Sequence, residues 1–295
     1  MDVFFVLSGT VMAMLAERKP APVLFLIKRA ARIWPLYFIC TTAALVLFLA
    51  GHKNMGLGSL DVAYVKSLFF IPTILPNWKI TPLLFPAWTL YYEAFFYVLI
   101  AGFLAIARLW AVNLVTLALS IIVLFSLHFD FTGPALLLEF LLGILVWKFR
   151  PQSGVISEKA FGIVVVGSFL ALCLFQYFDN SHLGGYYFHK NLYRVIAYAP
   201  VGAVIIWTSL GVNIQHSTSA IVSRVIKIGD ESYALYLTHA FIVYMYVYIS
   251  PIESRTFLAQ TCVLATGLPI SILLASQVHR YIDAPIQSAL KKRLS

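Results

Sequence analysis

Charged residues are scarce in this sequence of 295 residues. Asp, Glu, Lys and Arg make up 11% of the chain, whereas hydrophobic residues make up 61% and the mean hydropathy is +0.88. A soluble domain carries roughly a quarter charged residues. The scarcity of charge excludes a soluble globular domain. The apolar runs instead predict an all-α protein, a polytopic helical bundle whose partner is the lipid bilayer.

Cysteines and linkers are also scarce, and each absence excludes a class of structure. Cys40, Cys173 and Cys262 all lie in apolar runs and lack the spacing of metal ligands, so we expect no metal site and no disulfide. Neither a long linker nor an internal repeat divides the chain. We therefore expect residues 1–295 to form a single membrane domain, with no soluble C-terminal domain.

Basic residues outnumber acidic ones, 21 to 12, which gives a net charge of +9. They lie between the apolar runs, a pattern typical of membrane topology, so we expect no nucleic acid partner. No basic stretch with a cleavage site precedes the first apolar run, and we expect no cleavable signal peptide. The side richer in Lys and Arg is predicted to be cytoplasmic, which places the C-terminus in the cytoplasm.

About nine apolar runs are predicted to cross the membrane. They are residues 3–16, 34–50, 87–107, 111–128, 133–148, 160–177, 193–211, 230–249 and 257–278. The segment 62–75 ends in prolines and is expected to be interfacial or re-entrant. In the first run, Ser8 and Gly9 are small enough for a neighbouring backbone to approach closely, so a packing role is expected for both.

The third run carries an acidic residue within the membrane. Trp88, Tyr91 and Tyr92 stand at its start, where amphipathic rings favour the interface. Glu93 lies roughly 8 Å beyond Trp88 along a helix, and Tyr97 shares its face one turn later as a potential hydrogen-bond donor. A carboxylate at this depth either belongs to a polar site between helices or snorkels to the interface without further role.

Two arginines lie in the loop that is predicted between the first two spans, residues 17–33. Arg29 and Arg32 are three residues apart, so both guanidinium groups would project from one helical face. Such a pair suits a polyphosphate, because each planar fork can grip two oxygens. The alternative is ordinary positive charge that keeps the loop in the cytoplasm.

Glu139 and His239 are further ionisable residues within predicted spans, and such residues are functional candidates. Ser232 and Tyr236 precede His239 by seven and three residues, so a polar stripe follows one face of that helix. His239 is accordingly either a hydrogen-bonded structural residue or part of a catalytic site. The outer segments 51–86 and 178–192 mix aromatic and hydrogen-bonding side chains that could bind a saccharide, although interfacial loops have the same composition.

Taken together, five local patterns resemble those of the acyltransferase-3 family, membrane proteins that O-acylate bacterial surface polysaccharides and related acceptors. The patterns are Asp2-Val-Phe-Phe-Val-Leu-Ser-Gly9, Arg29-Ala-Ala-Arg-Ile-Trp-Pro-Leu-Tyr37, Trp88-Thr-Leu-Tyr-Tyr-Glu-Ala-Phe-Phe-Tyr97, Ile228-Gly-Asp-Glu-Ser-Tyr-Ala-Leu-Tyr-Leu-Thr-His239 and Asp283-Ala-Pro285. They occur in the family's order along the whole chain. The last departs mildly, because Glu is usual in the family where Asp283 stands.

The resemblance implies an enzyme of the bacterial plasma (inner) membrane. Cytoplasmic acyl-CoA, with acetyl-CoA expected, would be the co-substrate and place its phosphates on Arg29 and Arg32. The acyl group would pass to a hydroxyl of a saccharide or lipid-linked saccharide on the outer side. Glu93 and His239 are the expected catalytic residues, and the substrate pocket would be lined by Trp88, Tyr92, Tyr97, Ser232, Tyr233 and Tyr236. No bound cofactor is expected.

One departure concerns the catalytic base. In the family, a span with an Arg and the histidine taken as catalytic precedes the pattern that begins at Asp2, and this sequence has no such span. Either the natural chain starts upstream of Met1, has ten spans and is active, or the present chain is natural and is inactive or uses His239. In the first case His239 would be a helper that orients or hydrogen-bonds the reacting groups.

Two other classes compete with an enzyme. A secondary transporter can also carry isolated intramembrane Glu and His residues, but such proteins often show inverted repeats and broken helices, and neither is visible here. A structural scaffold leaves Arg29, Arg32 and Glu93 unexplained. Consumption of acyl-CoA separates the enzyme from the transporter.

Overall fold

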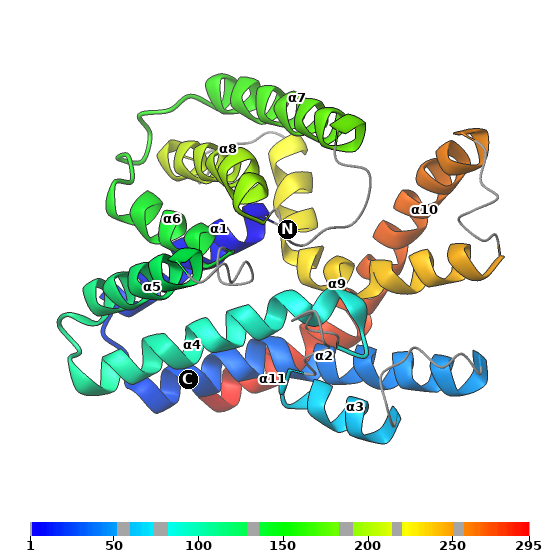
Figure 1. The fold of residues 1–295 in the computed structure, drawn as a ribbon, viewed down its shortest axis with the longest axis horizontal. Helices are drawn as coiled ribbons and strands as arrows, with labels where there is room; N and C mark the ends of the chain where they lie inside the picture. The colour runs from blue at the N-terminus through cyan, green and yellow to red at the C-terminus, as the bar shows by residue number, and fades with distance from the viewer. Residues whose placement is uncertain are drawn as a thin grey trace. The chain divides into compact units, whose positions relative to one another are not determined.

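The computed structural model describes residues 2–51, 60–72, 82–128, 136–182, 191–213, 220–249 and 257–294. Within these ranges the chain is helical and has no strand; one isolated bridge pairs Ile156 with Val212 (Figure 1). The all-α prediction is therefore confirmed. The elements are α1 (Asp2–Glu17), α2 (Pro22–Gly51), α3 (Leu60–Leu68), η1 (Phe85–Ala87), α4 (Trp88–Ile106), α5 (Ala111–His128), α6 (Leu137–Lys148), α7 (Glu158–His182), α8 (Asn191–Gly211), α9 (Ala220–Ile249), α10 (Phe257–Val278), η6 (His279–Asp283) and α11 (Ala284–Leu294).

Three helices are long and apolar enough to cross a membrane, at Pro22–Ala50, Phe85–Ile106 and Glu158–Phe175. They correspond to the predicted spans 34–50, 87–107 and 160–177, and the protein is accordingly a membrane protein. The segments Ala111–Phe125 and Val195–Gly211 are shorter apolar helices. The remaining predicted spans stay predictions.

The structure corrects the loop that was predicted over residues 17–33. Helix α2 begins at Pro22, so Arg29 and Arg32 lie on a helix that continues into the apolar run. The physical reason is that Ala, Leu, Lys and Arg all favour helix, whereas hydropathy detects only the apolar part. Helix α9 likewise begins at Ala220, before the predicted span 230–249. Helix α3 has nine residues, too few to cross a bilayer as one helix.

The helices form two compact units, each built from two stretches of chain. The first unit contains Met1–Leu26 and Phe95–Ser217, and the second contains Ile27–Ala94 and Thr218–Ser295. The boundaries fall inside α2 and α4, so neither unit is a separate domain in sequence. Whether residues 1–295 act as a single domain stays a prediction.

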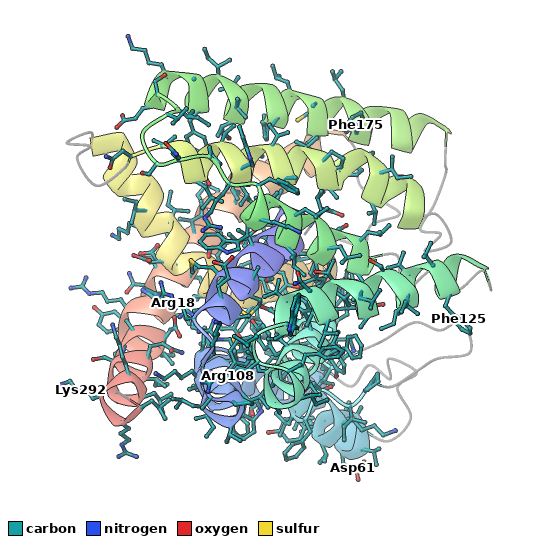
Figure 2. The ribbon with its side chains drawn as sticks, turned by 90° about the vertical axis from the view of Figure 1, so that its left-hand side faces the viewer. Arg18, Asp61, Arg108, Phe125, Phe175 and Lys292 are labelled. Carbon is teal, nitrogen blue, oxygen red and sulfur yellow. The ribbon has the colours of Figure 1, made fainter. Side chains whose placement is uncertain are left out.

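In the first unit, α1 packs on α6 and α8, α5 packs on α6, and α7 lies beside α8 (Figure 1). Large apolar side chains also lie on the surface of this unit. Phe125 on α5 is 58% exposed and Phe175 on α7 is 38% exposed (Figure 2). Exposed apolar rings on helices of a membrane protein are suited to contact with lipid chains.

Close packing of α1 on α6 depends on two glycines. A Cβ on Gly9 would collide with the carbonyl oxygen of Phe140, and a Cβ on Gly143 would collide with the carbonyl oxygen of Val6. The Thr10 hydroxyl joins the helices by a hydrogen bond of 3.0 Å to the carbonyl oxygen of Gly143. The packing role that the sequence predicts for Gly9 is confirmed, since small residues let membrane helices approach closely.

Gly143→Ala should destabilise the first unit by about 1–3 kcal/mol, because the new methyl group meets the α1 backbone, which cannot move aside as a flexible side chain can. Gly102→Ala on α4 is the matched control, because nothing lies within 4 Å of a Cβ built there. The measurement is the thermal unfolding midpoint of the purified protein in detergent. Equal midpoints for the two variants would contradict the packing account.

In the second unit, α9 packs against α10, and α10 continues through η6 into α11 (Figure 1). Helix α3 is fixed to α2 by two hydrogen bonds. The Trp34 indole N–H donates to the Leu68 carbonyl oxygen at 2.8 Å, and the Tyr37 hydroxyl donates to the Ser67 carbonyl oxygen at 2.8 Å. This unit contains most of the side chains that the sequence marks as functional.

Candidate functional site

A proline within α2 is the starting point of the site. Pro35 has no backbone N–H, so the carbonyl group of Ala31, four residues earlier, loses its usual helical donor. The side chain of Gln287 on α11 supplies that donor, with Nε2 at 3.2 Å from the Ala31 oxygen and 3.0 Å from the Arg32 oxygen. The hydrogen bonds that replace the missing donor thus connect α11 to the turn that carries Arg32.

Helix α9 supplies a hydrogen bond to the carbonyl group of Ile33, in the same turn of α2. The Tyr233 hydroxyl donates to the Ile33 carbonyl oxygen at 2.7 Å. The guanidinium carbon of Arg32 lies 5.7 Å from the centre of the Tyr233 ring, which is within cation–π range. Three of the five sequence patterns, those that contain Arg32, Tyr233 and Asp283, therefore meet around this turn.

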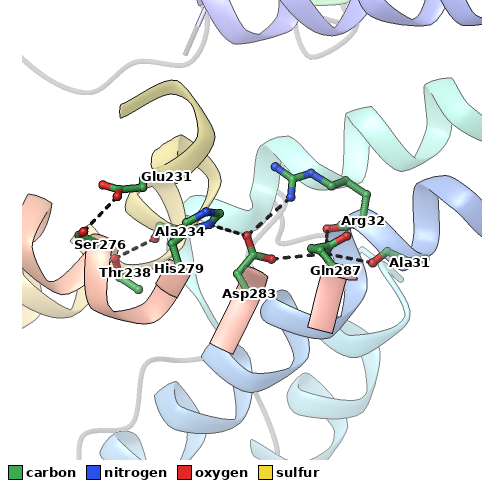
Figure 3. A network of polar contacts seen from close by, with 9 residues as sticks. All are labelled: Ala31, Arg32, Glu231, Ala234, Thr238, Ser276, His279, Asp283 and Gln287. Atoms are coloured by element: carbon green, nitrogen blue, oxygen red, sulfur yellow. Dashed lines mark hydrogen bonds and ion pairs between the residues drawn. The ribbon is translucent and has the colours of Figure 1, made fainter. Parts of the chain in front are cut away.

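The polar centre of the cluster is a buried carboxylate. Asp283 is 1% exposed, and its Oδ2 atom lies 3.6 Å from Nη1 of Arg32 and 3.0 Å from Nδ1 of His279 (Figure 3). Its Oδ1 atom accepts a hydrogen bond of 3.4 Å from Gln287. Both carboxylate oxygens are thus engaged, as the burial of a charge requires.

The backbone that carries Asp283 is a π-helix, a rare geometry that is often found at functional sites. Pro285 explains it locally, because it offers no N–H to the carbonyl of Tyr281 and its ring would clash with that group in an α-helix. The Ala284 N–H instead donates to the carbonyl of His279, five residues back. The widened turn places His279 and Asp283 side by side.

A second polar group lies where α9 meets the start of α4. The Tyr236 hydroxyl donates to the Pro86 carbonyl oxygen and lies 2.5 Å from the Thr89 hydroxyl. Glu93 is within electrostatic range of Tyr233 and of Tyr236. The second unit thus brings the carboxylate predicted to be catalytic close to two residues of the predicted pocket.

His239 lies one turn beyond Tyr236 on α9, with the two ring centres 6.0 Å apart. Its Nδ1 lies 3.1 Å from the Leu235 carbonyl oxygen, which can only accept, so in the neutral ring Nδ1 carries the proton. The Nε2 atom then keeps its lone pair, as a base or a hydrogen-bond acceptor requires.

The other predicted site residues are distributed over both units. Trp88 is buried and meets Tyr92 edge-on, with ring centres 6.1 Å apart. Ser232 lies on α9 next to Tyr233, and Arg29 is half-buried on α2. Tyr97 belongs to the part of α4 in the first unit and packs edge-on against Phe25 at 6.3 Å. The fully buried Glu139 also belongs to the first unit.

His279 and Gln287 were not among the predicted site residues, and Asp283 was noted only as part of a terminal pattern. A signal was present, because residues 279, 283 and 287 are spaced four apart and share one helical face. Their partner on α2 is about 250 positions away in sequence. Within the described ranges, no group of His, Cys, Asp and Glu side chains could hold a metal ion.

A family model described as an acyltransferase domain matches residues 1–276. The chain belongs to the acyltransferase-3 family. Four of the five patterns fall within the match, and Asp283-Ala-Pro285 follows it. The protein is therefore an acyltransferase, and the transporter and scaffold alternatives lose their support.

A curated relative in the acyltransferase-3 family is the exopolysaccharide production protein ExoZ of Rhizobium meliloti (strain 1021). It is 32% identical over 251 residues, which cover 81% of this chain and 74% of the relative. No solved structure matches the chain.

Proposed function

We propose that this acyltransferase moves an acetyl group from cytoplasmic acetyl-CoA to a hydroxyl group of a surface polysaccharide or its lipid-linked precursor. The plasma membrane would hold the protein, with the C-terminus in the cytoplasm. The observation that carries the proposal is the cluster around Arg32, where α2, α9 and η6 hold a partly exposed guanidinium group. The name of the ExoZ relative supports a polysaccharide acceptor.

The donor would bind through its phosphates. Arg29 and Arg32 are three residues apart on α2, so their side chains lie on neighbouring positions of one face. The side chain of Arg32 is 40% exposed. Its planar guanidinium group can pair with two phosphate oxygens at once. Lys28 on the same turn is exposed and adds positive charge.

The acyl group would then react beside Glu93 and His239. His239 follows Tyr233 by six residues, about 9 Å along the axis of α9. In the reaction the acceptor oxygen attacks the thioester carbonyl carbon, the carbon–sulfur bond breaks, and the acceptor proton ends on the CoA sulfur. Glu93 and Nε2 of His239 would hydrogen-bond the reacting groups and guide that proton.

Membrane vesicles from the native cells test the proposal with acetyl-CoA labelled in the acetyl group. We expect label in the saccharide fraction. Mild alkali should release this label, because it hydrolyses esters. Vesicles from a strain that lacks the gene are the control. Equal incorporation by both kinds of vesicle would contradict the proposal and favour an inactive homologue.

A further inference from the structure

The Arg32 guanidinium group contacts the carboxylate of Asp283 and the ring of Tyr233, and part of it stays exposed. Its Nη1 atom lies 3.6 Å from Asp283, a residue with 1% of its side chain exposed, whereas 40% of the Arg32 side chain is exposed. A guanidinium group has five N–H donors. Among the described residues, Asp283 is the carboxylate in ion-pair contact with it. A buried anion thus anchors one edge of the fork and leaves donors on the exposed side.

The backbone of Arg32 is held by the same helical segment. Gln287, one turn after Asp283, donates to the Arg32 carbonyl oxygen and to the Ala31 carbonyl oxygen, which lacks its helical donor because of Pro35. The segment from η6 to α11 therefore fixes both the side chain and the backbone of Arg32. This segment follows the residues that the family model matches.

His279 holds the same carboxylate as Arg32. Its Nδ1 lies 3.0 Å from the same Oδ2 atom that Arg32 approaches, and its side chain is 22% exposed. The Oδ1 atom is bound by Gln287. His279 and Gln287 thus fix the Asp283 carboxylate from its own helical segment, independently of Arg32. The carboxylate in turn determines where the Arg32 guanidinium group lies.

We propose that Asp283 and Gln287 are positioning residues for the acyl donor: they orient the Arg32 guanidinium group so that its exposed edge can bind a CoA phosphate. This rests on the proposed donor site at Arg29 and Arg32. Asp283 and Gln287 would act through Arg32, without contacting acetyl-CoA themselves.

The test is a double-mutant cycle on donor affinity, measured as the equilibrium binding of labelled acetyl-CoA to the full chain in lipid nanodiscs. Asp283→Asn should weaken binding about tenfold, and Asp283→Glu, which keeps the carboxylate, should recover most of the loss. In an Arg32→Ala background, Asp283→Asn should have no further effect, because residues that act as a unit are not additive.

Two further variants keep the test decisive if Asp283→Asn does not fold. Gln287→Met is close in size and removes only the amide, so we expect about a threefold weaker affinity that also disappears in the Arg32→Ala background. Ser276→Ala is the matched control, because its hydroxyl bonds to Glu231 at 3.0 Å and not to the Arg32 cluster. It should leave the affinity unchanged.

The outcomes separate this inference from the proposed function. If Arg32→Ala weakens acetyl-CoA binding but the Asp283 and Gln287 variants do not, the donor site stands and the positioning role is wrong. If the effects of Asp283→Asn and Arg32→Ala simply add, Asp283 acts by another route and the inference is wrong as well. If Arg32→Ala leaves the affinity unchanged, the proposed donor site itself fails.

Discussion

Replacing Arg29 and Arg32 together by alanine should weaken acetyl-CoA binding about a hundredfold. Hydrogen bonds to charged groups contribute about 1.5–3 kcal/mol each, so the loss of one phosphate contact from each arginine amounts to ~3 kcal/mol or more. The effect should be specific to the donor, because both side chains lie on one face of α2, where α9 and η6 contact Arg32. Acceptor affinity should change little.

Equilibrium binding of labelled acetyl-CoA to the protein in nanodiscs measures this effect. The matched control replaces Arg18 and Arg108 by alanine, two exposed arginines that lie in the first unit (Figure 2). It removes the same charge, so a general electrostatic effect would appear in both double variants. Unchanged donor affinity after loss of Arg29 and Arg32 would contradict the phosphate site and leave these residues as topology signals.

Glu93→Gln should abolish acyl transfer while the protein still inserts in the membrane. The change keeps the size of the side chain and removes its charge and its capacity to accept a proton. Proton transfer by a positioned side chain typically contributes 10²–10⁴-fold to rate, so the residual activity should be about 1% or less. Glu93 also lies within electrostatic range of Tyr233 and Tyr236, two residues of the predicted pocket.

Transfer of labelled acetyl groups in native membranes that carry the chromosomal variant measures the effect, with protein levels followed by immunoblot. Asp61→Asn is the control, because Asp61 is an exposed carboxylate at the start of α3 (Figure 2). We expect it to retain activity. Full activity of Glu93→Gln would reduce Glu93 to an interfacial residue.

The sequence predicts much of the architecture because membrane spans are local features. A run of about twenty apolar residues specifies a helix without reference to the rest of the chain, which is why α4 and the apolar part of α2 were predicted. The start of α2 was missed because Lys28-Arg-Ala-Ala-Arg32 is polar and yet favours helix. Hydropathy therefore located the membrane-spanning part of α2 and misassigned the two arginines to a loop.

The composition of the site was only partly predictable. Arg32 and Tyr233 were each selected from a local sequence pattern. Their cation–π contact depends on how α2 and α9 pack, which no local pattern shows. Pro35 deprives the Ala31 carbonyl group of its helical donor, as its position in the sequence implies. No neighbouring residue in the sequence indicates that Gln287 supplies the replacement. The π-helix at His279–Asp283 is likewise a tertiary feature, although Pro285 is its local cause. The catalytic roles of Glu93 and His239 stay predictions.

Photo-cross-linking with a photoreactive CoA analogue tests the central claim most directly, that the donor binds at the α2 turn around Arg32. The protein in native membrane vesicles is irradiated with the analogue, with and without excess acetyl-CoA, and the labelled peptides are identified by mass spectrometry. The account predicts labels in the peptides that contain residues 28–37, 227–233 or 279–287, which excess acetyl-CoA suppresses. Suppressible labels confined to peptides of the first unit would contradict it.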